Sequence, residues 1–438
     1  MKICNFLRCS IANRLSSWQD GLIAAIVLVL LIGSAAAQSQ KDTHVQDPRG
    51  RQQPLVIAKQ GSFYVGGRYV DGPDGQIMTG QMFVRYQIPQ NVKHGYPIVF
   101  IHGGGTAGTL WEETPDGREG WETFFVREGY AAYVVDQPSR GRSAVDPSGR
   151  ARGLRSSSPS VEKRHSVAER YNMWPQAHFH TQWPGGGVAG DAVFDQFYAA
   201  QVDSVGSPGQ IEEWIKAAGS TLLDKIGPAI IVGHSQSGNF LWILAEARPK
   251  LVKALVGLEP GNPPFYDVTL VGPPDWFKYS ATAAKPWGLT RVPLTYDPPV
   301  TDPAELNPVK EAQPQAPDLV PCYRQSEPAH KLPNLRGIPI VILTSEASFH
   351  APFDHCTAQY LSQAGVENTF IRLNKIGIHG NGHFLQLEKN SLQIARVIAN
   401  WLEENLDKKT QRVRKGLIVG RTSANSRSTQ DGSSSSNK

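Results

Sequence analysis

Cysteine is scarce in this sequence. Only four cysteines occur among 438 residues, and Cys4 and Cys9 lie within the first ten positions. A disulfide-dense scaffold is therefore excluded, and the other two, Cys322 and Cys356, allow a single bridge in an oxidising compartment. This bridge would close a loop of roughly thirty residues and stabilise the fold by about 3 kcal/mol through chain entropy. Two free buried thiols are the alternative.

The sequence also lacks a long apolar run near its start. The run from Gly21 to Ile32 is shorter than the ~20 residues that a transmembrane helix needs. Basic residues precede it and Ala35-Ala36-Ala37 follow it, an order typical of a secretory signal. We therefore expect residues 1–37 to be a signal peptide, and the mature protein to be secreted or periplasmic without stable membrane insertion. An uncleaved anchor is the alternative.

The middle of the chain has no excess of positive charge. The formal net charge is +5, but residues 408–438 carry +7 and residues 1–37 carry +2, which leaves −4 for residues 38–407. This distribution gives no support for nucleic-acid binding. We expect residues 38–60 to be a disordered lead-in and residues 407–438 to be a basic, Ser-rich flexible tail.

The hydrophobic pattern predicts one α/β domain over residues 61–406. Short buried strands alternate with helical stretches, and such crossovers predict a mostly parallel, doubly wound sheet. An opening pair of strands is expected at 63–70 and 81–88. Further strands are expected at 98–101, 131–136, 229–232, 254–258, 338–343 and 368–373, and helices at 121–128, 210–225, 239–247, 357–363 and 391–406.

Two segments interrupt this alternation. Residues 139–190 are rich in Ser, Arg, Gly, His and Trp, whereas residues 260–335 are dense in proline. Because neither keeps a helical or strand period, we expect both to be insertions that form a cap over a pocket. Their tryptophans are candidates to line an apolar site, with packing as the ordinary alternative: Trp174, Trp183, Trp276 and Trp287.

The segment Gly-His-Ser-Gln-Ser-Gly, residues 233–238, follows a predicted strand and precedes a predicted helix. A serine on such a sharp turn, with small neighbours, is the arrangement of a nucleophile elbow. Ser235 is therefore the predicted nucleophile. The pattern departs from Gly-x-Ser-x-Gly because Ser237 occupies the second glycine position. A serine that only caps the helix is the alternative, and Ser237 is the better cap candidate.

A serine hydroxyl needs a base, and the base needs a carboxylate that orients it. His383 is the predicted base because it follows the last strand on the loop that leads to the C-terminal helix, and His379 is the alternative. Glu259 is the predicted carboxylate because it directly follows the strand after the nucleophile strand. Glu346 and Asp354, which lie one strand later, are the alternatives.

A glycine run, Gly103-Gly104-Gly105, follows the strand 98–101. It lacks the Gly-Lys-Ser/Thr ending of a phosphate-binding P-loop. Glycine allows backbone N–H groups to approach a reacting carbonyl, so we expect the oxyanion hole to use Gly103 or Gly104 together with Gln236. An ordinary turn is the alternative.

These motifs together resemble the α/β-hydrolase superfamily over roughly residues 61–406. The resemblance rests on the His-Gly-Gly-Gly segment, the Asp136–Ser143 segment, the turn at Ser235 and the late Gly-His-Phe. The segment from Trp111 to Trp121 and the position of Glu259 more narrowly resemble bacterial exported esterases with a Ser-His-Glu triad. That similarity implies Glu259 rather than Asp354 as the triad acid.

The resemblance implies a serine esterase that cleaves small-molecule carboxylic esters through an acyl-enzyme, without a metal or other cofactor. Lactonase, amidase or acyltransferase activity on the same residues is the nearest alternative. A non-catalytic binding module is a further alternative. A metal site at His178 and His180 is disfavoured because no further ligands are evident in the sequence. A homo-oligomer is compatible with these features.

Overall fold

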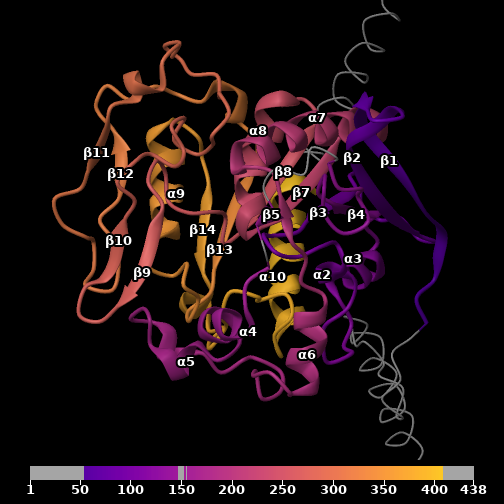
Figure 1. The fold of residues 1–438 in the computed structure, drawn as a ribbon, viewed down its shortest axis with the longest axis horizontal. Helices are drawn as coiled ribbons and strands as arrows, with labels where there is room; N and C mark the ends of the chain where they lie inside the picture. The colour runs from indigo at the N-terminus through magenta and orange to yellow at the C-terminus, as the bar shows by residue number, and fades with distance from the viewer. Residues whose placement is uncertain (1–53, 147–151, 154, 408–438) are drawn as a thin grey trace, which may run out of the picture. The chain divides into compact units, whose positions relative to one another are not determined.

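The computed structural model describes residues 54–146, 152–153 and 155–407 (Figure 1). The expected signal peptide and residues 408–438 of the expected tail lie outside these residues. Residues from Val56 onward belong to one unit, to which the description below applies. The first strand begins at Ile57, so the last residues of the expected lead-in belong to the sheet.

An eight-stranded sheet forms the centre of this unit, with the order β1-β2-β4-β3-β7-β8-β13-β14 (Figure 1). The five pairs from β4 to β14 are parallel, whereas β1–β2 and β2–β4 are antiparallel. The predicted α/β class with a mostly parallel sheet is confirmed. The strands are β1 (Ile57–Gly72), β2 (Gly75–Pro89), β3 (Ile98–Ile101), β4 (Ala132–Asp136), β7 (Ala229–His234), β8 (Val252–Leu258), β13 (Ile340–Thr344) and β14 (Thr369–Arg372).

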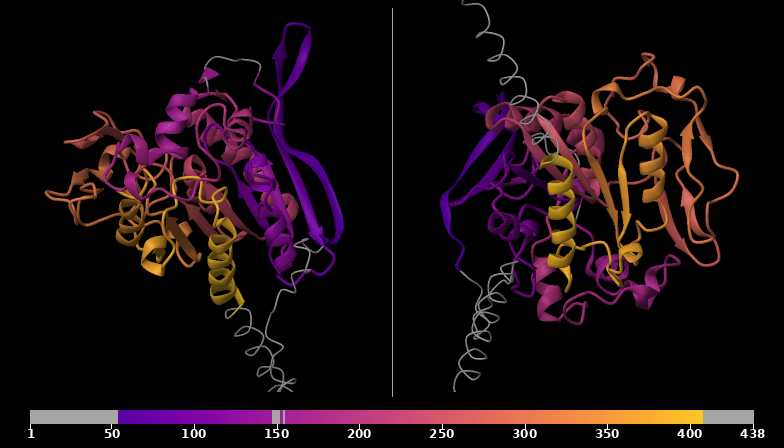
Figure 2. Two further views of the ribbon diagram at one scale, coloured as in Figure 1. Left: turned by 90° about the horizontal axis from the view of Figure 1, so that it is seen from below. Right: turned by 180° about the vertical axis from the view of Figure 1, so that it is seen from behind.

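Helices lie on both faces of the sheet (Figure 2). Helix α10 packs against α3, and helix α7 packs against α8 and β1. Strands covered on both faces are buried throughout, as all residues of β3 and β7 are, which explains their continuous Ile/Val runs. The main helices are α3 (Trp121–Glu128), α7 (Pro208–Ile226), α8 (Gly238–Ala247), α9 (Asp354–Gln363) and α10 (Ser391–Leu402).

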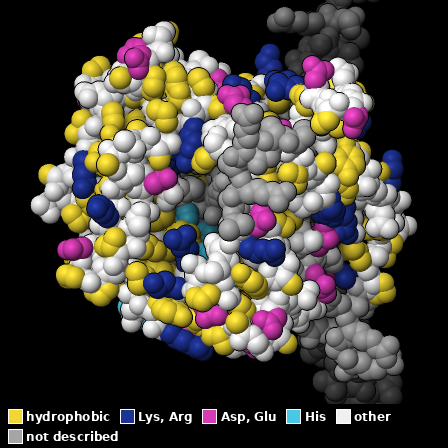
Figure 3. Space-filling view, viewed as in Figure 1, with side chains coloured by type: hydrophobic (Ala, Val, Ile, Leu, Met, Phe, Trp, Pro, Cys, Tyr) yellow, Lys and Arg dark blue, Asp and Glu magenta, His cyan; other side chains and the backbone are white. Residues whose placement is uncertain are grey.

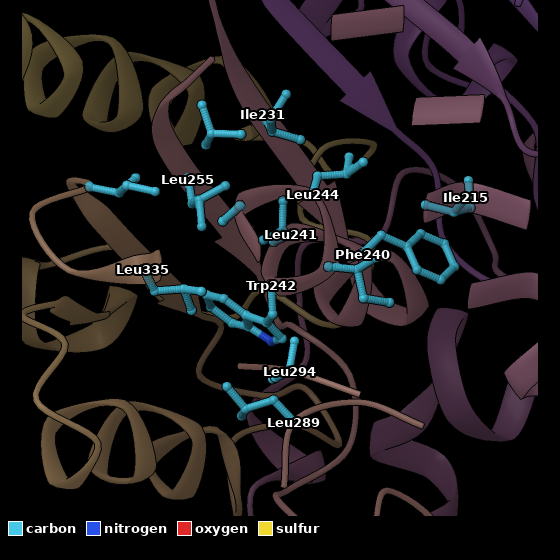
Figure 4. Packing of buried hydrophobic residues seen from close by; sticks show 14 of the residues in the cluster. Ile215, Ile231, Phe240, Leu241, Trp242, Leu244, Leu255, Leu289, Leu294 and Leu335 are labelled. Carbon is cyan, nitrogen blue, oxygen red and sulfur yellow. The ribbon is translucent and has the colours of Figure 1, made fainter. Parts of the chain in front are cut away.

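The hydrophobic core fixes helix α8 firmly against the sheet. Ile231 of β7, Leu241 and Leu244 of α8, and Leu255 of β8 are each at most 2% exposed and lie side by side (Figure 4). Every residue of α8 from Gly238 to Ala245 is buried. The turn that leads into α8 is therefore flanked by tightly packed elements, which hold its side chains in a fixed position.

The two interrupting segments contain only short elements. The first holds α4 (Ser158–Val161), the π-helical turn η1 (Glu162–Ser166), α5 (Ala168–Tyr171) and η2 (Ala177–Phe179). The second holds the hairpins β9 (Val268–Gly272) with β10 (Trp276–Tyr279) and β11 (Pro308–Lys310) with β12 (Tyr323–Gln325). Elements of this length show no sustained period in the sequence. The first segment also holds β5 (Arg152–Gly153). Smaller elements outside both segments are α2 (Thr109–Glu112), α6 (Ala192–Ala199) and β6 (Ser204–Val205).

The predicted disulfide between Cys322 and Cys356 is confirmed, with the two Cα atoms 5.3 Å apart. It ties the segment before β12 to helix α9 across 34 positions of sequence. Both cysteines are buried beside Val320 and Phe353. The bridge therefore fastens part of the second insertion to a helix of the central domain.

Removing this bridge should lower the free energy of unfolding. A Cys322→Ala/Cys356→Ala variant is expected to lose about 3–4 kcal/mol, because the unfolded chain regains the loop entropy that the bridge removes. Urea denaturation with and without reductant measures the loss. Reductant should destabilise the parent protein and leave the double variant unchanged, and equal sensitivity of both proteins would contradict the assignment.

Across the described ranges, no helix combines the length and apolarity needed to cross a lipid bilayer.

Candidate active site

Ser235 lies on a sharp turn between β7 and α8. Its φ is 56°, in the left-handed region that a residue with a Cβ adopts only under strain. The short 3-10 turn η3 (Ser235–Ser237) then leads directly into α8. The strained strand-to-helix turn expected of a nucleophile elbow is therefore present.

Two glycines make this turn sterically possible. A Cβ on Gly233 would lie 2.8 Å from the carbonyl oxygen of Ser237, and a Cβ on Gly238 would lie 2.3 Å from the Cα of Pro260. Both contacts are too short for a real side chain, so glycine is required at these positions. The second glycine of the motif has therefore moved by one residue, from 237 to 238.

The Ser237 side chain has a structural role in the turn. Its hydroxyl lies 2.8 Å from the carbonyl oxygen of Ile101 and 2.9 Å from that of His234. The first contact ties the turn to the end of β3. Ser237 thus fills the space beside the turn with a hydrogen-bonded hydroxyl where the common motif has no side chain.

The structure brings the loop with His383 against the turn with Ser235. His234 Nε2 lies 2.9 Å from the carbonyl oxygen of His383, and the two imidazole rings are 4.5 Å apart between centroids. Within the described residues, no hydrogen bond joins the Ser235 hydroxyl to the His383 ring. Catalytic hydrogen bonds are often long in ligand-free structures and shorten when substrate binds.

Glu259 contacts His383, with its Oε2 2.5 Å from His383 Nδ1. The carboxylate is fully buried and directly follows β8. Its Oε1 accepts from the N–H of Ser345 at 2.9 Å, and its Oε2 accepts from the Ser348 hydroxyl at 2.5 Å. His383 Nδ1 faces Glu259, and within the described ranges no hydrogen bond involves His383 Nε2.

The two alternative carboxylates each hold a different histidine. Asp354 Oδ1 lies 2.8 Å from His350 Nδ1, while its Oδ2 accepts from the Thr344 hydroxyl at 2.7 Å. Glu346 lies 3.1 Å from His379, the alternative base, whose side chain is 61% exposed. Neither alternative acid therefore holds the histidine that contacts the turn.

The environment of His383 favours its neutral form. Burial lowers the pKa of His383 well below its ordinary value of 6.5. Electrostatic repulsion from neighbouring basic side chains adds to this effect, and these side chains are His234, His350, His165 and Arg164. Burial and the nearby Asp354 raise the pKa of Glu259, against the hydrogen bonds from Ser348 and Ser345. A neutral imidazole at neutral pH is the form that a general base needs.

This lowered pKa predicts an acid-tolerant enzyme. A base must be neutral to act, so lowering its pKa moves the acid limb of kcat/KM to lower pH. We expect half of the neutral-pH value to be lost only below pH 6.5, the ordinary pKa of histidine. The test is a pH–rate profile with a neutral 4-nitrophenyl ester, with intrinsic fluorescence as the control for folding. A midpoint at or above 6.5 would refute this prediction.

The predicted oxyanion residues surround the turn. A Cβ on Gly103 would lie 3.0 Å from the Cβ of Ser235, and a Cβ on Gly104 would lie 3.6 Å from the side-chain oxygen of Gln236. Glycine at 103 therefore permits the loop after β3 to approach Ser235 closely. The structure brings Gly103, Gly104 and Gln236 together around Ser235.

Sequence reasoning missed Arg140, which contacts both the loop after β3 and the turn after β7. Its guanidinium donates to the side-chain oxygen of Gln236 at 2.8 Å and to the carbonyl oxygen of Gly103 at 3.2 Å. The residue is buried, and burial lowers its pKa to about 10. In the sequence, the Asp136–Ser143 segment contributes only to the family resemblance, and nothing in its pattern indicates this contact.

Sequence reasoning also missed His350 and His165, whose rings stack near His383. Their centroids lie 4.7 Å and 5.4 Å from that of His383. His350 follows β13 on a loop, and His165 lies in η1 of the first insertion. Loop histidines far apart in sequence carry no period that would have placed them together.

A cavity of about 400 Å³ opens beside Ser235. Figure 3 shows histidine side chains in a hollow of this face, with Lys and Arg side chains around it. None of the four tryptophans proposed to line an apolar site borders this cavity within the described residues. Trp174 and Trp183 are instead buried in packing contacts. The cavity is lined by Arg164, Pro208, Ser235, Gln236, Asn239, Gly261, Asn262, Asp267, Val268, Thr269, Leu270, Lys285, Arg291, Phe349 and His350.

His180, one of the two histidines considered for a metal, is engaged by carboxylates. Its Nε2 lies 2.7 Å from Glu388 and its Nδ1 lies 3.3 Å from Glu169. Although burial opposes it, these two hydrogen bonds raise the pKa of His180 to about 9. These contacts occupy both ring nitrogens of His180, whereas the His178 ring lies against that of Phe179.

Comparisons with known proteins identify the family of this chain. The Alpha/beta hydrolase family matches residues 98–397. A relative named "Probable secreted lipase phiG" from Fungal sp. (strain ATCC 74256) is 41% identical over 385 residues, which cover 86% of this chain and 98% of that protein. A solved structure described as a novel bacterial esterase is 26% identical with a TM-score of 0.52, covering 81% of this chain and 98% of its own. This chain belongs to the alpha/beta hydrolase family.

Proposed function

We propose that this chain hydrolyses carboxylic esters through an acyl-enzyme on Ser235. One observation carries the proposal: a buried His383–Glu259 pair lies against the strained turn that presents Ser235. The relative at 41% identity is named a probable secreted lipase, and the solved relative is described as an esterase, which supports the same reaction class. The first name also supports the expected export of this chain.

In the proposed reaction, His383 Nε2 accepts the proton of the Ser235 hydroxyl while the oxygen attacks the ester carbonyl. Glu259 holds the Nδ1–H and stabilises the imidazolium that forms. N–H groups of Gly103 or Gly104 and of Gln236 bind the oxyanion. The imidazolium then protonates the departing alcohol, and water attacks the acyl-enzyme with His383 again as the base.

We further propose that the two insertions cover the substrate site. Thr269 and Leu270 of β9 come from the second insertion, and Arg164 comes from the first. All three line the cavity that contains Ser235. Substrate selection would then depend on the insertions, while the central domain supplies the reacting groups.

A fluorophosphonate probe tests the nucleophile directly. We expect one equivalent of probe per chain, and mass spectrometry of the digested protein should locate it on the peptide that contains Ser235. Heat-denatured protein is the control, because labelling requires the activated serine. Labelling of another residue in the folded protein, or no labelling at all, would overturn the proposal.

An ester panel tests the reaction class. Neutral 4-nitrophenyl esters of different chain lengths are expected to be hydrolysed with a burst of nitrophenol when deacylation is slow. Lactones and amides in the same panel measure the alternative activities of this fold. Faster turnover of a lactone or amide than of every ester would replace the esterase assignment.

A further inference from the structure

The cavity beside Ser235 has an unusually basic lining. Three cationic side chains, Arg164, Lys285 and Arg291, line it together with a single carboxylate, Asp267. They come from different parts of the chain and meet only in the folded structure. A cavity for a neutral acyl chain needs no such groups, because hydrophobic contacts alone would hold it.

The three cations differ in how they are neutralised. Arg291 lies 3.0 Å from Glu212 and 3.9 Å from Asp267, so its charge is already paired. Arg164 and Lys285 have no carboxylate within ion-pair distance in the described part of the chain. Two positive charges of the lining are therefore available to a ligand.

Of these two cations, Lys285 has the larger desolvation penalty. Its side chain is 1% exposed, and its ammonium donates to the carbonyl oxygen of Asn262. Burial lowers the pKa of Lys285 to about 8, so the group is still mostly cationic at neutral pH. A buried cation with one neutral acceptor is unfavourable on its own and is stabilised by an anion.

Arg164 lies on the opposite insertion and is exposed toward solvent. Its guanidinium stacks over the Phe349 ring at 5.2 Å from the centroid. This contact orients the side chain, and no hydrogen bond from its N–H groups is present among the residues that the structure describes, so they can bind a carboxylate or phosphate. The following residue, His165, stacks on His383, so η1 places Arg164 in the cavity and His165 against His383.

We propose that the natural ester carries an anionic group, a carboxylate or phosphate, that Arg164 and Lys285 bind in this cavity. The inference rests on the proposed ester hydrolysis at Ser235 and specifies the substrate class. Val268, Leu270 and Phe349 line the same cavity and would contact the carbon skeleton between the anion and the scissile bond.

Matched pairs of esters test this substrate class. For an anion on the acyl side, the pair is 4-nitrophenyl hydrogen adipate and 4-nitrophenyl hexanoate. For an anion on the alcohol side, it is 4-acetoxyphenylacetate and 4-acetoxyphenylacetamide. We expect kcat/KM to be at least about tenfold higher for the anionic member of one pair. A charge-assisted hydrogen bond between the anion and the protein contributes enough binding free energy for a difference of this size. This preference should decrease as salt is added, because Arg164 is exposed.

Variants identify the groups responsible for the preference. Arg164→Gln and Lys285→Met should each reduce the anionic-to-neutral ratio of kcat/KM by about tenfold. Lys163→Gln removes the same charge from the adjacent exposed residue, which does not line the cavity, and should leave the ratio unchanged. Arg164→Glu should reverse the preference, and this exposed position gives a test even if the buried Lys285 variant fails to fold.

The outcomes separate this inference from the proposed function. Equal turnover of both members of each pair by the parent protein would overturn the anionic substrate and leave the esterase assignment standing. A preference that survives in Arg164→Gln, Arg164→Glu and Lys285→Met would also overturn it. Failure of Ser235 to react with the fluorophosphonate, by contrast, would remove the proposed function itself.

Discussion

Replacing Ser235 by alanine is expected to lower kcat for ester hydrolysis by a factor on the order of 10⁴ to 10⁶. The change removes the only atom that forms the acyl-enzyme in the proposed reaction, while the rest of the site remains. Alanine also fits the turn without new contacts, since its Cβ is already present in serine. Steady-state turnover of a 4-nitrophenyl ester and fluorophosphonate labelling measure the effect.

Ser237→Ala is the matched control for this variant. It removes a hydroxyl from the same turn, where it contacts the carbonyl oxygens of Ile101 and His234. We expect this loss to cost about 1 kcal/mol of stability and fluorophosphonate labelling to persist. If Ser237→Ala abolished labelling and Ser235→Ala did not, the nucleophile would be misassigned.

Replacing Glu259 by glutamine should produce the second largest effect, a fall in kcat of about 10⁴-fold. An amide in this position can donate a hydrogen to His383 Nδ1, which would shift the ring proton to Nε2. The nitrogen that must accept the Ser235 proton would then already be protonated. The pair is buried with 2.5 Å between Glu259 Oε2 and His383 Nδ1, so solvent cannot substitute for the carboxylate.

Asp354→Asn and Glu346→Gln are the controls for Glu259→Gln. Asp354 holds His350 and Glu346 holds His379, so both variants should retain far more activity than Glu259→Gln. Denaturant midpoints for all three proteins separate loss of catalysis from loss of folding, which matters because Asp354 is buried. If Asp354→Asn caused the larger fall in kcat with an intact fold, the triad acid would be Asp354.

The buried elements of the fold were predictable from the sequence. The strand at 98–101 and the helix at 121–128 match β3 and α3 residue for residue. The strand is entirely apolar, and the helix carries clustered apolar residues between Gly120 and Gly129, which leaves few other ways to bury either segment. The start of β1 was not predictable, because Lys59 and Gln60 pair through their backbones with Ile88 and Gln87. Backbone pairing of an edge strand does not depend on a hydrophobic pattern.

The residues of the candidate site that directly follow buried strands were located by the strand pattern. Ser235 and Glu259 follow β7 and β8 directly, so the strand pattern located them. The contacts of Arg140, and the stacking of His350 on His383, depend on how loops meet in space. Local sequence preferences do not predict such contacts between loops, because loops without periodicity are positioned by tertiary packing.

The one-residue displacement of the second glycine has a consequence for sequence searches and for engineering. A search that demands glycine two positions after the nucleophile would overlook this protein and any relative built in the same way. Restoring the common pattern by Ser237→Gly would remove two contacts between the hydroxyl and carbonyl oxygens. It would not relax the requirement at Gly238, which is set by Pro260. Substituting the common pattern at this turn is therefore not expected to stabilise the protein.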